Sequence, residues 1–218
     1  HLAADYVQHA LRQVPRDSYI LQLDIRKYYH SIDRDILRQL IARKIKDERL
    51  LNLIMLFAGN NGQPGTPIGN LLSQLFGLIY LNPIDQFVKR ELKTKYYARY
   101  VDDFVLIGLS REQALAHKAA IVEFLKQKLN LSLSKSSIHR VTRGINFVGF
   151  RTWSSKRFVR KRALYVFRHA VVKYKLESIV SCLGHARKTA SLQTMLSYIR
   201  SNHHDAYRQL PETIRRVH

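Results

Sequence analysis

Three aspartates stand where short apolar segments end or turn, and carboxylates in such places can bind metal ions. Asp24 closes the apolar run 19–25, while Asp102 and Asp103 form the turn of a predicted hairpin over 96–108. Adjacent carboxylates in a tight turn repel one another, and a divalent cation removes that penalty. If a sheet brings Asp24 beside the hairpin, two metal ions about 4 Å apart can clamp the attacking and leaving oxygens of a phosphoryl transfer. Taken singly, each aspartate is more readily explained by local turn formation.

The elements that must position these residues follow from hydrophobic periodicity. Strands are predicted over 19–25, 96–100, 104–108, 131–141 and 145–153. Helices are predicted over 2–12, 33–46, 47–58, 70–88, 110–129, 164–182 and 191–208. Asp33 and Ser110 are expected to cap their helices, and Pro83 to kink the long helix or end its first part. The order of elements indicates an α+β fold, a sheet backed by helices, with a helical region after residue 155.

Composition points to a polyanionic partner. The chain has 218 residues, with 37 Lys and Arg against 16 Asp and Glu, and a formal net charge of +21. More than half of this excess lies after residue 150, and such a field favours phosphate-rich partners. A basic protein without such a partner, or one facing a membrane surface, is the alternative. The single cysteine, Cys182, and the lack of a membrane-length apolar run favour a soluble protein in a reducing, cytoplasmic compartment.

Two segments resemble motifs of the reverse transcriptases, in the same order and with a similar separation. They are 100–103 (YVDD) with its apolar flanks and 23–29 (LDIRKYY). The resemblance implies an RNA-directed DNA polymerase that uses template RNA, a DNA primer and deoxynucleoside triphosphates. It also implies that Asp24 and Asp102 bind two Mg²⁺ ions, for which Mn²⁺ can substitute. Ile25 would add a backbone carbonyl to the metal site, and Asp103 would support it from nearby.

Further positions match the same family. Tyr29 matches the aromatic steric gate, the ring that excludes a ribose 2′-hydroxyl, although a ring that fills core space is the alternative. Lys135 matches a lysine that approaches the triphosphate, although an exposed strand lysine explains it equally. The segment 147–150 (FVGF) resembles the primer-grip hairpin, and the basic helices after 155 resemble a thumb that follows the duplex backbone. His203 and the adjacent histidine lack partner thiols for a zinc site.

One motif narrows the resemblance to the reverse transcriptases of diversity-generating retroelements, which are prokaryotic or phage-encoded. The segment 68–74 (IGNLLSQ) has Ile68 and Gln74 where most reverse transcriptases have Gln and Pro, around the shared Gly69. Those enzymes copy a template RNA with frequent errors at adenines and act with a small basic accessory variability protein. Exchange of an amide for the branched alkyl of Ile68 removes a hydrogen-bonding contact near the new base pair. Group II intron or retron-type enzymes, and a non-catalytic nucleic-acid-binding palm, remain alternatives.

The resemblance also predicts a domain organisation. Residues 1–18 are expected to be a remnant of the fingers, and 19–155 the palm, with inserted fingers helices at about 34–66. Residues 156–218 are expected to form a thumb-like basic helical region. The earlier finger strands of the family have no counterpart in this sequence, so the chain is expected to be a fragment of a longer protein or to obtain their function from another segment.

Overall fold

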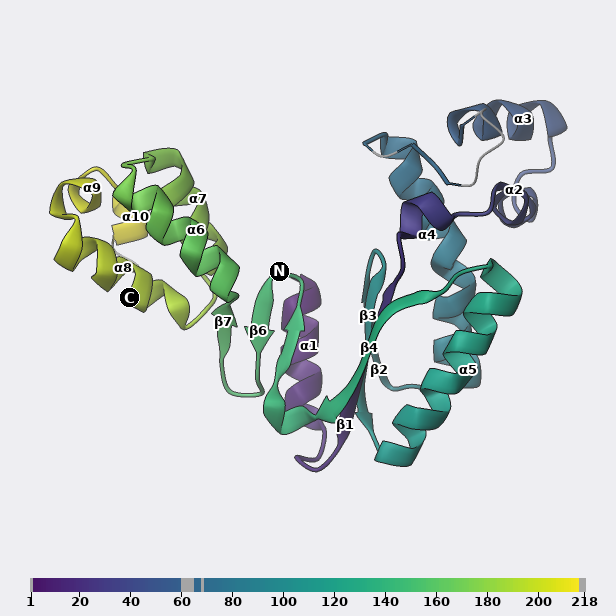
Figure 1. The fold of residues 1–218 in the computed structure, drawn as a ribbon, viewed down its shortest axis with the longest axis horizontal. Helices are drawn as coiled ribbons and strands as arrows, with labels where there is room; N and C mark the ends of the chain where they lie inside the picture. The colour runs from purple at the N-terminus through teal and green to yellow at the C-terminus, as the bar shows by residue number, and fades with distance from the viewer. Residues whose placement is uncertain (1, 60–64, 68, 216–218) are drawn as a thin grey trace. The chain divides into compact units, whose positions relative to one another are not determined.

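The structure is a computed structural model that describes residues 2–59, 65–67 and 69–215 (Figure 1). The chain forms two compact units. The larger unit comprises Val14–Val141, and the smaller unit comprises the residues up to Gln13 together with those from Thr142 onward. None of the helices in the described ranges combines the length and apolar content needed to cross a bilayer. The division into fingers, palm and thumb at residues 18 and 155 stays a prediction.

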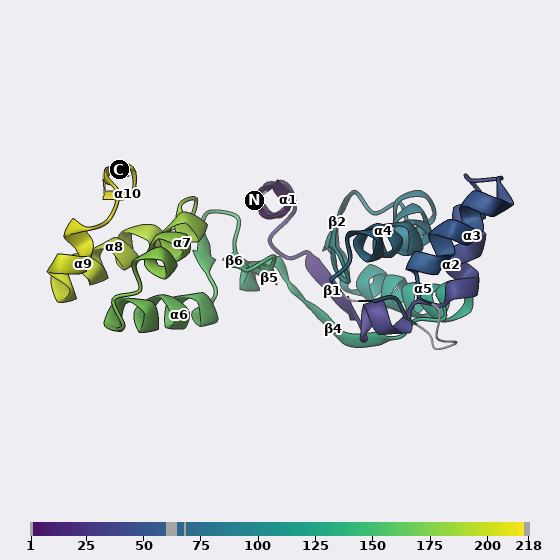
Figure 2. The ribbon, with the colours of Figure 1, turned by 90° about the horizontal axis from the view of Figure 1, so that it is seen from above.

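The larger unit contains a four-stranded antiparallel sheet in the order β2-β3-β1-β4. Its strands are β1 (Tyr19–Ile25), β2 (Tyr96–Tyr100), β3 (Asp103–Leu109) and β4 (Leu133–Arg140). Its helices are α2 (Arg34–Ala42), α3 (Glu48–Phe57), α4 (Leu71–Gln86) and α5 (Arg111–Leu129). Figures 1 and 2 show α4 and α5 on the same side of the sheet. The predicted α+β class, an antiparallel sheet backed by helices, is confirmed.

Alternation along β1 decides which face of the sheet meets the helices. Leu21, Leu23 and Ile25 are buried and belong to the main apolar core with residues of α4 and α5. Gln22 and Asp24, on the opposite face, are only half-buried. Because successive strand residues point to opposite faces, the apolar side chains pack and the polar ones are left on the other side. Asp24 therefore lies on the face of the sheet opposite α4 and α5.

The predicted helix caps are confirmed. Asp33 Oδ1 accepts hydrogen bonds from the backbone N–H groups of Asp35 (3.0 Å) and Ile36 (3.2 Å) at the start of α2. Ser110 and Gln113 form a reciprocal capping box at the start of α5. Each cap satisfies N–H groups that have no partner within the helix. Local sequence signals thus fix where both helices begin.

The long helix α4 continues through Pro83 and changes form soon after it. Regular α-helix ends at Gln86 and passes into a π-helical turn over Phe87–Glu91. Proline removes one backbone hydrogen bond from a helix. Ile84 and Val88, which follow Pro83 in the sequence, are nevertheless fully buried in the core. Packing of these side chains holds the helix together across the proline, in line with the general dependence of helices on tertiary contacts.

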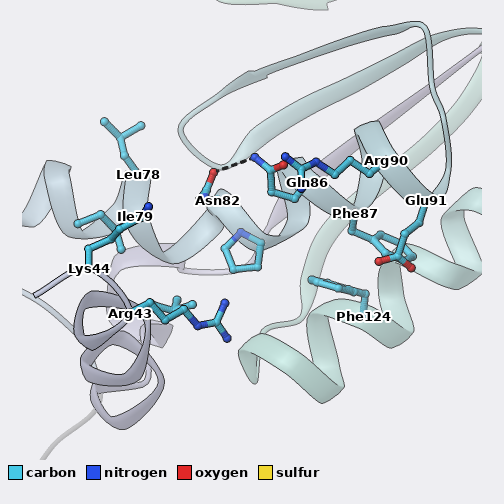
Figure 3. Close-up of a pocket in the computed structure, with 12 residues that line it drawn as sticks. Arg43, Lys44, Leu78, Ile79, Asn82, Gln86, Phe87, Arg90, Glu91 and Phe124 are labelled. Carbon is cyan, nitrogen blue, oxygen red and sulfur yellow. Dashed lines mark hydrogen bonds between the residues drawn. The ribbon is translucent and has the colours of Figure 1, made fainter. Parts of the chain in front are cut away.

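A hollow of about 610 Å³ opens between α2, α4 and α5, on the helical side of the larger unit (Figure 3). Phe87 and Phe124 stack at its wall with ring centroids 4.5 Å apart. The basic side chains of Arg43 and Arg90 also line it. Its lining residues come from α2 and the turn just after it, from α4, from α5 and from the π-helical turn, so no strand residue contributes to it.

The smaller unit joins the first helix to a small sheet and five helices. Its sheet has the antiparallel order β5-β6-β7, with β5 (Ile145–Phe147), β6 (Phe150–Thr152) and β7 (Arg157–Val159). Its helices are α1 (Leu2–Gln13), α6 (Lys161–Val172), α7 (Leu176–Ala186), α8 (Ser191–Asn202), α9 (His204–Arg208) and α10 (Glu212–Arg215). These helices and the sheet share a second apolar core.

Three predicted elements of the smaller unit are divided in the structure. The strand predicted over 145–153 is a hairpin that turns at Val148–Gly149, where both residues have positive φ angles. The helix predicted over 164–182 is two helices, because Tyr174 adopts a left-handed conformation (φ 50) and ends the first. The helix predicted over 191–208 ends at Asn202, and a separate helix, α9, begins at His204. Hydrophobic periodicity alone does not reveal a turn of one to three residues.

Candidate active site

Asp24 and Asp103 lie opposite each other on neighbouring strands. They are register partners in the antiparallel pair β1–β3. Directly opposed residues of an antiparallel pair point to the same face of the sheet. The side chain of Gln22, on that same face, donates a hydrogen bond from Nε2 to Asp103 Oδ1 at 3.0 Å. The two carboxylates therefore share the face of the sheet opposite α4 and α5.

Asp102 lies in the turn that joins β2 to β3 and adjoins the end of β1. The backbone N–H of Ile25 donates to the carbonyl of Asp102 at 3.2 Å, which ties the turn to β1. Burial raises the pKa of Asp102; a backbone hydrogen bond opposes this rise, and the nearby Asp24 carboxylate adds to it. The structure thus brings the three aspartates predicted from the sequence to one end of the sheet.

The turn before Asp102 is strained. Val101 has a φ of 57°, in the left-handed region that a β-branched residue rarely adopts. Arg99 stabilises this turn, because its Nη1 donates to the Val101 carbonyl at 3.0 Å. The same guanidinium binds Asp85 on α4 through Nε–Oδ1 (2.8 Å) and Nη2–Oδ2 (2.5 Å). Tyr97 also donates to Asp85 Oδ1 at 2.6 Å, so three side chains fix the hairpin onto α4.

Strand β4 adds two residues beside Asp24. The Ser134 hydroxyl donates a short hydrogen bond to Asp24 Oδ1 and lies 3.2 Å from its carbonyl oxygen. Lys135 is the register partner of Asp24 on β4 and is exposed, so it lies on the same face as the aspartates. Ser134 could not be predicted as a site residue, since a serine on an exposed edge strand is unremarkable until its register is known.

Tyr29 stands at the start of a 3₁₀ turn (Tyr28–Ser31) that follows β1. Its ring contacts that of Tyr28, with centroids 5.2 Å apart, and is half-exposed. Burial, and secondarily the nearby carboxylate of Asp102, raises the pKa of the Tyr29 phenol. The predicted steric-gate residue is therefore close to the aspartates.

The motif 68–74 is placed only in part, since Ile68 lies outside the described residues. Gly69 has a φ of 97° and a Cβ atom there would meet nothing within 4 Å. Asn70 caps α4, its Oδ1 accepting from the N–H of Leu72 at 2.9 Å. Gln74 is exposed on the first turns of α4. Neither Gly69 nor Gln74 makes a hydrogen bond or ion pair with the three aspartates.

The residues at this end of the sheet suit a hard divalent cation. Carboxylate and carbonyl oxygens are the ligands that Mg²⁺ prefers. The Asp24 carboxylate disfavours the charge on Asp102, and a cation between them would remove this repulsion. In the ranges that the structure describes, no three acidic, histidine or cysteine side chains converge on one point. Asp103 is engaged with Gln22 instead, which leaves Asp24 and Asp102 as the pair suited to binding metal.

Comparison with known proteins agrees with this arrangement. Residues 1–152 match the family "Reverse transcriptase (RNA-dependent DNA polymerase)". Protein YkfC of Escherichia coli (strain K12) is 26% identical, over 73% of this chain and 54% of its own length. Telomerase from Candida albicans, solved with a fragment of telomeric RNA, shares the fold with a TM-score of 0.56 and 13% identity, over 95% of this chain and 43% of that one.

The protease-reverse transcriptase of a foamy virus, solved with an RNA/DNA hybrid, has a TM-score of 0.55 and 15% identity, over 96% of this chain and 29% of that one. At such low identity the two solved structures show the fold alone. The chain spans about half the length of YkfC and less than half of either solved chain. The family match, by contrast, covers most of the sequence and includes both strands that bear the aspartates. This chain belongs to the reverse transcriptase (RNA-dependent DNA polymerase) family.

Proposed function

We propose that this chain is the polymerase core of an enzyme that synthesises DNA on an RNA template. A primer 3′-hydroxyl attacks the α-phosphate of a deoxynucleoside triphosphate, a phosphodiester bond forms, and pyrophosphate leaves. The observation that supports this most directly is the pairing of Asp24 with Asp103, with Asp102 in the adjoining turn. Segments far apart in the sequence bring these aspartates to one end of the sheet, in a member of the reverse transcriptase family.

In this proposal, Asp24, Asp102 and the carbonyl of Ile25 hold two Mg²⁺ ions, with Mn²⁺ as an alternative. The ions would supply positive charge to the hydroxyl and phosphate oxygens that react. Ser134 orients the Asp24 carboxylate through its hydroxyl. The hydrogen bond from Gln22 holds the Asp103 carboxylate near Asp24 and Asp102. These contacts fix the acidic side chains before substrate binds, which is the usual means by which such sites reduce reorganisation.

Other residues of the chain would contact the nucleotide and the duplex. Tyr29, close to Asp102, would lie against C2′ of the sugar and select deoxynucleotides. Lys135, opposite Asp24, would approach the triphosphate. The basic residues after 155 would follow the duplex backbone. A chain with a net charge of +21 gains affinity for nucleic acid by releasing counterions from the phosphates. Template RNA and a DNA primer are thus the proposed partners.

The finer proposal is that the enzyme belongs to a diversity-generating retroelement. It rests on the segment 68–74, with Ile68 and Gln74 in place of the usual Gln and Pro. A small basic accessory variability protein would be a further partner. We expect Ile68→Gln to lower misincorporation opposite template adenine in primer extension. An unchanged error spectrum would refute this part of the proposal and favour a group II intron or retron-type enzyme.

The direct test is primer extension on poly(rA)/oligo(dT) with Mg²⁺ or Mn²⁺. It uses the chain and also the chain extended at its amino end by finger strands taken from another reverse transcriptase. We expect synthesis that Asp102→Asn abolishes. Asp205→Asn is the matched control, because Asp205 is exposed in α9 and its exchange removes the same charge. If the folded, extended protein binds primer-template and yet makes no product with either metal, the non-catalytic palm is the better reading.

A further inference from the structure

Gly77 occupies the interior of α4, where glycine is a poor helix former and a structural reason is expected. It is buried, and two tyrosine rings lie where its side chain would be. A Cβ atom at this position would lie 3.1 Å from Cε1 and 3.4 Å from the hydroxyl oxygen of Tyr29, and 3.2 Å from Cε1 of Tyr28. Such contacts are tighter than ordinary van der Waals distances, so a methyl group here would have to displace a ring.

Of the two rings, Tyr29 is the one that can move. Tyr28 is only 3% exposed, and its hydroxyl donates to the Gly77 carbonyl at 2.5 Å. Its ring is therefore held by the core on all sides and by a hydrogen bond to the helix. Tyr29 is half-exposed, so its ring is the less confined of the two. A methyl group on Gly77 would thus push the Tyr29 ring outward.

The backbone of Tyr29 cannot follow its ring, because the segment after α3 holds it. Thr66 donates its N–H to the Tyr29 carbonyl at 2.9 Å, and Gly65 donates to the Ile32 carbonyl at 2.8 Å. Gly65 itself, with a φ of 101°, lies so close that a Cβ atom there would be 2.9 Å from His30 Cα. The main chain of the 3₁₀ turn is therefore fixed, and displacement by α4 must appear as rotation of the Tyr29 side chain.

We propose that Gly77 is a positioning residue for binding of the deoxyribose, since the absence of a side chain sets how far the Tyr29 ring stands from the sugar of the incoming nucleotide. This inference rests on the proposed polymerase function and on Tyr29 as the steric gate. Gly77→Ala moves the ring into the space that the deoxyribose occupies. The site then narrows, and the affinity for deoxynucleotides falls without any change in the acidic residues that support the reaction.

The experiment measures steady-state primer extension with deoxy- and ribonucleotides, and nucleotide binding to enzyme on a chain-terminated primer, where no reaction takes place. For Gly77→Ala we expect about a tenfold rise in KM and Kd for deoxynucleotides, with kcat changed much less and ribonucleotides still excluded. Gly184→Ala is the matched control, because Gly184 is also helical and a Cβ atom there meets nothing within 4 Å. It should leave all values as in the unaltered chain.

The double variant separates positioning from a general structural effect. Tyr29→Ala alone should admit ribonucleotides, and adding Gly77→Ala to it should change KM little, because the displaced ring is gone. Equal losses with and without the Tyr29 ring, or a loss confined to kcat, would overturn the inference while the polymerase function stands. If the unaltered protein shows no metal-dependent synthesis, the proposed function itself fails.

Should Gly77→Ala not fold, Tyr28→Leu/Gly77→Ala gives the methyl group room on the side of the buried ring and keeps the contact with Tyr29. It is compared with Tyr28→Leu alone. The same rise in KM for deoxynucleotides is expected between these two variants, and its absence contradicts the role assigned to Gly77.

Discussion

One guanidinium, that of Arg99, binds both the Asp85 carboxylate on α4 and the carbonyl of Val101 in the turn before Asp102. The Arg99 side chain is 10% exposed and that of Asp85 25%, so the pair is largely withdrawn from water. It links the helical layer to the hairpin at the point where the backbone is strained. Placement of Asp102 therefore depends on a charge pair outside the acidic cluster.

We expect Asp85→Asn to lower the free energy of unfolding by about 2 kcal/mol, because it leaves a buried guanidinium without its counter-charge. Primer extension should fall further than stability alone explains, since the turn with Asp102 loses its support. Glu48→Gln is the matched control: it breaks the exposed pair Arg38–Glu48 and should cost less than about 1 kcal/mol. Urea denaturation and extension rates check both. Equal costs for the two variants would contradict a supporting role for Arg99.

The hydroxyl of Ser134 is expected to matter for activity and little for stability. Ser134→Ala frees the Asp24 carboxylate to rotate, and we expect about a tenfold fall in kcat because a misplaced ligand weakens the transition state. The free energy of unfolding should change by less than about 1 kcal/mol, as for one exposed hydrogen bond. Ser134→Thr retains a hydroxyl and should restore the rate.

Ser136→Ala serves as the control on the same strand. Ser136 pairs with Leu23 on β1, so it points to the other face of β4. We expect this variant to match the unaltered chain in kcat and KM. If both alanine variants lose activity alike, the effect belongs to the edge strand as a whole and not to the bond with Asp24.

The sequence predicted those parts of the fold that depend on neighbouring residues. Apolar alternation placed β1, and the side chains of Asp33 and Ser110 placed two helix starts. It also predicted that Asp24 and Asp102 would meet, because two motifs in the right order imply one sheet. Breaks such as the left-handed Tyr174 were not predicted, since any residue type can be forced into a short turn by packing around it.

Contacts that join distant segments could not be predicted from the sequence. Nothing local indicates that Asp85 would pair with Arg99, or that Gly77 would face the ring of Tyr29. Such partners depend on register and helix rotation, which are set by the whole core. The same holds for Arg157, which is only 3% exposed although it lies in a short basic segment.

Arg157 fastens α1 to the small sheet, and its removal should loosen that helix. Its guanidinium donates to Asp5 Oδ1 and to the Ala4 carbonyl, each at 2.7 Å, and to Gln8 Oε1 at 3.0 Å. We expect Arg157→Met to lower the free energy of opening of α1 by about 2 to 3 kcal/mol. Hydrogen exchange of the α1 amides measures it. Arg160→Met, at an exposed position, is the control, and equal exchange in both variants would contradict the anchor.

Divalent cations should stabilise the larger unit whether or not substrate is present. Asp24 and Asp102 are close enough that one carboxylate disfavours the charge of the other, and a bound cation removes that cost. At 10 mM Mg²⁺ and constant ionic strength, we expect the free energy of unfolding to rise by about 1.4 kcal/mol if the Kd is about 1 mM.

Removing one of the two charges separates this effect from general ion binding. Asp102→Asn relieves the repulsion and the burial cost of the charge, so without divalent cations it should be more stable than the unaltered chain, and it should lose the response to Mg²⁺. Asp205→Asn, which removes an exposed charge elsewhere, should keep that response. Chelation followed by urea denaturation measures all three proteins. A Mg²⁺ response that persists in Asp102→Asn would mean that the cation binds at some other place and that the acidic end of the sheet is not the metal site.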